Sequence, residues 1–374
     1  MIPQSFDDAP LVFVYLGEKF PDYGLSSLGI VTRTTGNPIV VLGDGPAPKG
    51  LPSEVEWIRN ETFYSGEEFR AFSLNPNFSA EFRDGFWLKT AERFFVLKAF
   101  MERHHPGAIF HGELDCLFMN LRLVESEIVA TQLSGLFLPR ETDSRCIASL
   151  VYINELGALK FVCQYLVDNA HLGNEMDILG SLQHHQDSPV HALPSAEFLY
   201  RAEPGRGEPV PWAVAPSQPS FIADGAVLGR WIFGVDPRNT GGRGTKNRIQ
   251  NHKYGVPWDF PLADLTFELD PTKDWRVSVS KPDGESYWLA VIHVHSKIHQ
   301  KLTALYFRRV LNRLRAGKAT TIVAMEVRFP LEVAGRIARQ VVISVRSADR
   351  LRASLRHLLS PAWWAGLKDR LTRL

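Results

Sequence analysis

Two short apolar runs near the start of the chain, at 11–16 and 38–42, constrain the fold more than any other feature. Residues 25–34 between them form an expected helix, and the order strand, helix, strand is typical of a parallel β-α-β unit. Neither run alternates polar with apolar residues, and strands of that kind are covered on both faces. The sequence therefore predicts an α/β fold with a mostly parallel, Rossmann-type sheet flanked by helices.

The segment 108–118 contains a further expected strand, which ends in two carboxylates, Glu113 and Asp115. An expected helix at 86–103 precedes it and stops at the helix-breaking sequence 104–107. Because an isolated buried charge is unfavourable, the acidic pair predicts a divalent cation, and hard oxygen ligands suit Mg²⁺ or Mn²⁺. The alternative is a strand end with two solvated acids.

A later expected strand, 287–297, carries His293 and His295 on one face, because side chains alternate along a strand. A neutral imidazole can complete a metal shell that carboxylates begin. Lys297 follows and could neutralise a diphosphate. The alternative is a pair of hydrogen-bonded structural histidines.

Together these elements resemble the GT-A fold of nucleotide-sugar glycosyltransferases over about residues 10–300. Glu-Leu-Asp at 113–115 stands where that family has Asp-x-Asp. The motif Asp-Gly-Ala-x-x-Gly at 224–229 and the segment Gly-Val-Asp-Pro-Arg-Asn at 234–239 are similar to segments of bacterial polysaccharide (capsule or O-antigen) glycosyltransferases. The chain departs from the family pattern in its first acid, which is Glu, and in its tight spacing of His and Lys.

The resemblance implies a nucleoside-diphosphate sugar donor, a glycan or glycolipid acceptor, and Mn²⁺ or Mg²⁺ as the cofactor. The implied metal ligands are Glu113, Asp115, His293 and His295, with Glu113 acting through the metal or the ribose. The implied nucleotide contacts are Tyr15 and Gly17 at the end of the first strand, with Arg93, Glu113 and Lys297.

Three other candidates have both a catalytic and a structural interpretation. Arg93, on the helix before the acidic pair, could stabilise the departing diphosphate or form an ordinary salt bridge, and Lys89 is a weaker candidate one turn away. Glu175 and Asp177 begin an expected helix at 174–182, where the family often places an acid that faces the acceptor. The helix dipole alone also favours acids at that position.

The Gly-rich segment 234–244 could cradle a phosphate or form a lid that orders on donor binding. Arg238, Arg243 and Arg248 would then meet anionic groups. An ordinary surface loop remains the alternative for this segment.

Residues 301–374 hold 16 Lys and Arg against 4 Asp and Glu, although the whole chain has a net charge of +1. Over 347–374, Leu and Trp alternate with Arg, which predicts a basic helical extension on an anionic membrane surface. The alternative is a helix packed on the catalytic domain with a solvated basic face. We expect no nucleic acid partner, because the extension lacks a recognisable binding motif.

We therefore expect a catalytic domain over 1–300, with its donor half at about 1–150 and its acceptor half at about 151–300, and the extension over 301–374. Within the catalytic domain, the sequence pattern predicts an irregular region at 46–76, a helix over 121–136, a strand at 146–153 and a long loop at 184–219. No signal peptide or membrane span is evident, so we expect a cytoplasmic protein, or a peripheral one at the inner face of the cell membrane. The three cysteines lack metal-type spacing, which indicates reduced structural thiols and argues against zinc.

Two rival functions remain open from the sequence. The same acids and histidines could serve a metal-dependent phosphoesterase or nucleotidyltransferase. Alternatively, the chain could be a non-catalytic membrane-associated binding protein whose acids are solvated.

Overall fold

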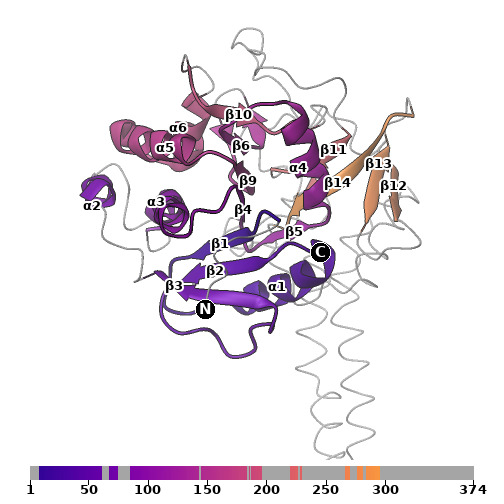
Figure 1. Cartoon of the computed structure of the whole chain (residues 1–374), viewed down its shortest axis with the longest axis horizontal. Helices are drawn as coiled ribbons and strands as arrows, with labels where there is room; N and C mark the ends of the chain where they lie inside the picture. Colours follow the sequence, from indigo (N-terminus) through magenta and orange to yellow (C-terminus); the bar gives the residue numbers. More distant parts are fainter. Residues whose placement is uncertain are drawn as a thin grey trace, which may run out of the picture. The chain divides into compact units, whose positions relative to one another are not determined.

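The computed structural model in Figure 1 describes residues 8–60, 67–74, 85–142, 145–182, 185, 187–195, 220–225, 228–229, 266–269, 276–280 and 284–294. These residues all belong to the first of two compact units, Met1–Gly317. The second unit, Lys318–Leu374, lies outside the described residues, and so does the predicted membrane-binding segment.

The first unit is built on a seven-stranded sheet with the order β10-β6-β9-β4-β1-β2-β3. Its strands are β1 Leu11–Tyr15, β2 Ile39–Gly43, β3 Val55–Arg59, β4 Ile109–Gly112, β6 Leu136–Leu138, β9 Leu150–Ile153 and β10 Val190–Ala192. The pairs within β4-β1-β2-β3 are parallel, as is β10 with β6, whereas β9 is antiparallel to both neighbours. The predicted α/β class with a mostly parallel sheet is confirmed.

Helices cover both faces of this sheet, as predicted. They are α1 Asp22–Thr34, α2 Glu67–Ser73, α3 Phe86–His104, α4 Leu121–Ala130, α5 Leu156–Asp168 and α6 Glu175–Ser181, with a 3-10 turn at Ala170–Leu172. Leu11 and Phe13 of β1 join a core with α1 and α4, whereas Val12 between them joins the opposite core with α3, α5 and α6. Figure 1 shows α3 and α5 on one side of the strands and α1 and α4 on the other. None of the described helices is both long and apolar enough to cross a bilayer.

Two corrections concern elements that the sequence pattern hid. The region 46–76, expected to be irregular, contains β3 and α2. Strand β3 is an edge strand, and its solvent-facing Arg59 and partly exposed Glu56 interrupt the apolar pattern that identifies β1 and β2. The long loop expected at 184–219 contains β10, which extends the sheet beside β6.

Two further corrections concern boundaries. The helix expected over 121–136 ends at Ala130, because Gln132 and Gly135 take positive φ angles of 58° and 151° that an α-helix excludes. Strand β6 then follows. The strand expected at 146–153 is divided into β8 (Arg145–Cys146), which pairs with β7 (Arg140–Thr142), and β9.

A second sheet brings the two halves of the sequence together. It contains β11 Phe221–Ala223, β12 Thr266–Leu269, β13 Val277–Ser280, β14 Ser286–His293 and, paired with β14, the short strand β5 Cys116–Phe118. The antiparallel register of β5 and β14 places His293 directly opposite Cys116. The late histidine strand therefore adjoins the acidic turn.

Candidate metal centre

Glu113 and Asp115 lie in the turn that directly follows β4, as predicted. The Cys116 N–H donates to the Glu113 carbonyl oxygen at 3.0 Å, and the Asp115 carbonyl oxygen accepts from the Val294 N–H at 2.7 Å. After β3 the chain crosses to the other side of β1 and enters β4, so the strand order reverses between β1 and β4. The acids therefore lie at the carboxyl end of a strand at the switch point, where α/β sheets bind ligands.

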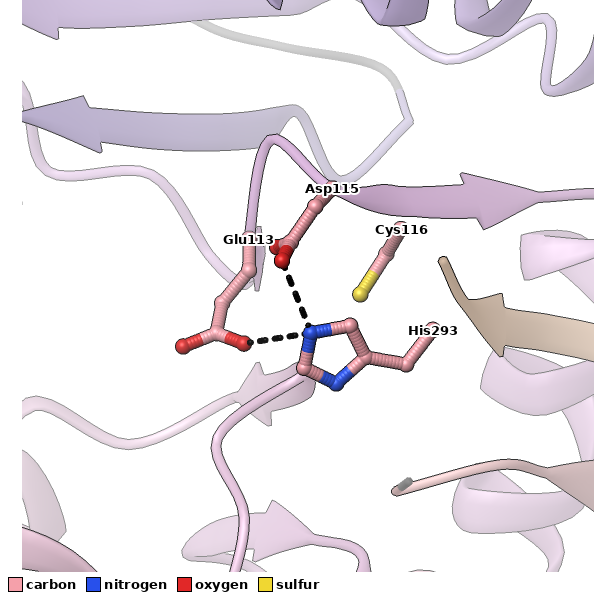
Figure 2. A group of neighbouring side chains, drawn as sticks. All are labelled: Glu113, Asp115, Cys116 and His293. Atoms are coloured by element: carbon pink, nitrogen blue, oxygen red, sulfur yellow. Dashed lines mark hydrogen bonds and ion pairs between the residues drawn. The ribbon is translucent and has the colours of Figure 1, made fainter. Parts of the chain in front are cut away.

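His293 reaches these acids from the end of β14, as Figure 2 shows. Its Nε2 lies 3.0 Å from Asp115 Oδ2 and 3.5 Å from Glu113 Oε2. Its Nδ1 lies 2.8 Å from the Gly225 carbonyl oxygen, and because a carbonyl oxygen only accepts, Nδ1 carries a proton. In the neutral imidazole, Nε2 is then a lone-pair acceptor that faces two carboxylates.

His293 Nε2 and Asp115 Oδ2 are both acceptors in this tautomer, and two acceptors 3.0 Å apart require a proton or a cation between them. A divalent cation fits, because ligand atoms of Glu113, Asp115, Cys116 and His293 all lie within 4.8 Å of one another. Asp115 and His293 are almost fully buried, which makes compensation of their charge and lone pairs necessary. Glu113, Asp115 and His293 therefore form a possible site for a divalent metal.

Asp224, which the sequence interpretation left without a role, fixes the backbone around His293. Its Oδ2 accepts from the N–H groups of Gly229 at 2.7 Å and His293 at 3.2 Å, and its Oδ1 accepts from Leu228 at 2.9 Å. A Cβ at Gly229 would lie 1.7 Å from the His293 carbonyl oxygen, so this approach requires glycine. Burial raises the pKa of Asp224, whereas the hydrogen bonds from Gly229 and His293 act to lower it, and the effect of burial is the larger. In the sequence, the signal for this role of Asp224 was the Asp-Gly-Ala-x-x-Gly spacing of residues 224–229.

Arg93 of α3 joins Glu113 to Glu175 at the start of α6. Its Nη1 donates to Glu113 Oε1 at 2.6 Å and its Nη2 to Glu175 Oε1 at 3.1 Å. Burial alone would lower the pKa of Arg93, but the two carboxylates together raise it. Burial raises the pKa of Glu175, and Arg93 opposes that shift. The salt-bridge interpretation of Arg93 is thus confirmed, and its contact with a diphosphate stays a prediction.

Asp177 differs from Glu175 although both lie in the first turn of α6. Its side chain is 43% exposed and pairs through Oδ1 with Arg145 Nε at 3.2 Å. The Asn174 side chain caps the helix, since its Oδ1 accepts from the Asp177 N–H at 3.0 Å and its Nδ2 donates to Asp177 Oδ2 at 2.7 Å. The structural interpretation of Asp177 therefore holds, and its acceptor role stays a prediction.

Tyr15 and Gly17 lie at the carboxyl end of β1, beside polar groups from the next two strands. The Tyr15 carbonyl oxygen accepts from the Asp44 N–H at 3.2 Å and from Asn60 Nδ2 at 3.4 Å, and Asn60 Nδ2 also reaches Asp44 Oδ1 at 3.1 Å. The hydroxyl of Tyr15 donates to the Lys19 carbonyl oxygen, and burial followed by the Asp44 charge raises the pKa of Tyr15. Asn60 Oδ1 is buried with no hydrogen-bond partner among the described residues.

Several residues predicted to take part in the site are not among the groups that the structure brings together there. Lys89 is exposed on α3. His295, Lys297 and the segment 234–244 lie outside the described residues, together with Arg248.

Cys116 was missed as a member of the cluster, because its spacing was compared only with the other cysteines. All three cysteines are buried, and none is part of a disulfide bond among the described residues. Burial and then the Glu113 carboxylate raise the pKa of Cys116 well above its ordinary value. The signal available in the sequence was its position directly after Asp115.

Comparison with known proteins adds little to this geometry. No known protein family and no curated protein matches the sequence. Matching solved structures include the apo crystal structure of mouse xyloside xylosyltransferase 1, at a TM-score of 0.36 and 10% identity, over 50% of this chain and 85% of that chain. A likeness this distant leaves the chemistry to be argued from the residues of the site.

Proposed function

We propose that this protein is a metal-dependent glycosyltransferase that moves a sugar from a nucleoside-diphosphate sugar to a glycan acceptor. The observation that carries the proposal is the meeting of Glu113, Asp115 and His293 at the switch point of a mostly parallel sheet. The motif resemblance of the sequence points to the same chemistry, because glycosyl transfer from such donors must stabilise a departing diphosphate.

In this proposal Glu113, Asp115 and His293 hold Mn²⁺ or Mg²⁺, and their oxygen and imidazole donors suit either ion. When bound, the cation would neutralise negative charge on the leaving diphosphate. Arg93 acts on this step by position: it holds Glu113 Oε1, which leaves Oε2 directed at the site. Lys297 would supply a further positive charge to the diphosphate.

The nucleoside would lie at the carboxyl ends of β1 to β3. Tyr15 and Gly17 border this edge, and the buried Asn60 Oδ1 offers an acceptor to an N–H group of the base. On the acceptor side, Glu175 would act through Arg93, and the partly exposed Asp177 would orient an acceptor hydroxyl. The acceptor that we propose is a bacterial surface or lipid-linked glycan, approached from the cytoplasmic side of an anionic membrane by the basic extension.

The test is a calorimetric titration of the full chain with UDP, GDP and CMP, each with and without Mn²⁺. Asp115→Asn is compared with Asp187→Asn, an isosteric change at an exposed Asp whose φ of 61° Asn tolerates. We expect metal-dependent binding of one nucleotide in wild type and Asp187→Asn, and loss of that binding in Asp115→Asn. The matching nucleotide sugars then serve as donors in a transfer assay.

The rival functions correspond to other results. Metal-dependent cleavage of the nucleotide phosphate without sugar transfer would identify a phosphoesterase or nucleotidyltransferase. Absence of all nucleotide and metal binding would overturn the enzyme proposal in favour of a binding protein. Co-sedimentation with anionic rather than neutral vesicles, lost when 347–374 is removed, tests the membrane contact.

A further inference from the structure

Cys116 places a thiol beside the three oxygen and nitrogen ligands of the metal centre. It begins β5, is fully buried, and stands opposite His293 in the antiparallel register. Opposed residues on one face of such a pair have Cβ atoms about 4.5–5.5 Å apart, so the two side chains share a face. Figure 2 shows the sulfur on the same side of the imidazole as the Asp115 carboxylate.

The four donors differ in the cations that they prefer. Carboxylate oxygens suit Mg²⁺ and Mn²⁺, whereas a thiolate is a soft ligand that selects Zn²⁺ and similar thiophilic ions. One cysteine, one histidine and two carboxylates also make up the four ligands that a closed tetrahedral zinc site needs. The four donors therefore match the preferences of two classes of cation.

The donor spacing is compatible with the tetrahedral arrangement. With bonds of about 2.0–2.3 Å, neighbouring ligand atoms of a tetrahedral zinc lie about 3.3–3.7 Å apart. His293 Nε2 lies 3.0 Å from Asp115 Oδ2 and 3.5 Å from Glu113 Oε2. Since all four ligand atoms lie within 4.8 Å, side-chain movements of about 1 Å would bring them to these distances.

We propose that Cys116 is a fourth ligand for thiophilic divalent cations, and that Zn²⁺ or Cd²⁺ bound in this way closes the centre and inhibits the protein. The inference rests on the metal centre of the proposed function. The Cys116 thiol transfers its proton to solvent as the metal–sulfur bond forms, and no oxidation occurs. A hard cation leaves Cys116 protonated and keeps positions open for water and the diphosphate, whereas the four-ligand arrangement leaves none.

The experiment titrates the full metal-free chain with Co²⁺ and follows the near-ultraviolet charge-transfer absorption of a cobalt–thiolate bond. Cys116→Ala is compared with Cys163→Ala, which removes an equally buried thiol from α5. We expect the thiolate band in wild type and Cys163→Ala and its loss in Cys116→Ala. Zn²⁺ affinity should fall about tenfold or more in Cys116→Ala, whereas Mn²⁺ affinity, measured by electron paramagnetic resonance, should change less than about twofold.

A second measurement needs no variant and covers the case in which Cys116→Ala does not fold. The ¹¹³Cd resonance of the wild-type complex should show the downfield shift of a sulfur ligand. Binding of Co²⁺ or Cd²⁺ without any thiolate signature would overturn the role of Cys116 and leave the metal centre intact. Failure of Mn²⁺, Co²⁺ and Cd²⁺ alike to bind would overturn both the thiol ligand and the metal centre.

Discussion

Glu113 has one oxygen in each of two buried polar clusters, and the clusters differ in whether the chain itself supplies a cation. Oε1 belongs to an ion-pair cluster in which Arg93 also contacts Glu175. Oε2 belongs to the candidate metal cluster, where Asp115 Oδ2 and His293 Nε2 face each other. In the ion-pair cluster the cation is a side chain, whereas the function proposed above requires the candidate metal cluster to bind one from solution. Each cluster can be perturbed separately.

The largest effect should follow removal of the resident cation. Arg93→Met leaves Glu113 and Glu175 buried without their guanidinium, which should lower the free energy of unfolding by about 3–5 kcal/mol. Urea denaturation at neutral pH measures this loss. Adding Glu175→Gln to the variant should recover part of it, because one of the two uncompensated charges is then removed. Equal stability of wild type and Arg93→Met would contradict the assignment of Arg93 as a structural cation.

Removing a ligand from the metal cluster should have the opposite effect on the metal-free protein. The side-chain amide that Asp115→Asn introduces can donate to His293 Nε2, so two facing acceptors become a hydrogen bond worth about 1 kcal/mol. We expect the metal-free variant to be at least as stable as wild type in urea, while its Mn²⁺ affinity falls about 100-fold. A strongly destabilised metal-free variant would mean that His293 is already charged and that the pair is an ordinary salt bridge.

The contrast between the clusters also explains how much of the site could be predicted from sequence. Strands β1 and β2 are predominantly apolar and β4 carries a single polar residue, His111, because these strands are buried on both faces, and the acids follow β4 directly. Their partners could not be identified from local patterns, since Glu175 lies 82 positions from Arg93 and His293 lies 178 from Asp115. Only the packing of α3 on α6 and of β5 on β14 decides which charge meets which.

The same distinction applies to the residues that were missed. Asp224 accepts three backbone N–H groups, and although the Asp-Gly-Ala-x-x-Gly spacing marks the two from Leu228 and Gly229, no local spacing brings the third, from His293, to the same carboxylate. Cys116 became part of the cluster through strand register rather than through a cysteine motif. Edge strand β3 was hidden because its solvent-facing residues are polar, so an apolar pattern identifies central strands better than edge strands.

A third prediction concerns Glu92, the neighbour of Arg93 on α3. Burial and then the Asp44 charge raise the pKa of Glu92 to about 7. The folded state thus keeps this proton to higher pH than the unfolded chain, so the wild type loses stability as pH rises from about 4.5 to 7. Because the side chain is partly exposed, we expect Glu92→Gln to be about 1–2 kcal/mol more stable than wild type at pH 8 and equal to it at pH 4.5.

Thermal unfolding over pH 4.5–8 checks the Glu92 prediction. Glu102→Gln is the control, since Glu102 is exposed at the other end of the same helix and pairs with Lys160 at 3.0 Å. A pH-independent difference between wild type and Glu92→Gln would show that Asp44 and burial do not act on Glu92.

The smallest stability effect should come from Asp177, which tests the boundary between structural and functional acids on one helix. Its ion pair with Arg145 is partly exposed, so Asp177→Asn should cost less than about 1 kcal/mol, whereas Glu175→Gln alters a fully buried partner of Arg93. If Asp177 orients the acceptor, its substitution should lower sugar transfer while leaving nucleotide binding and hydrolysis of the donor unchanged. Unchanged sugar transfer would mean that Asp177 has only a structural role at the start of α6 and that other residues contact the acceptor. The ratio of transfer to hydrolysis therefore separates a group that meets the acceptor from one that only stabilises α6, which a loss of total activity alone cannot do.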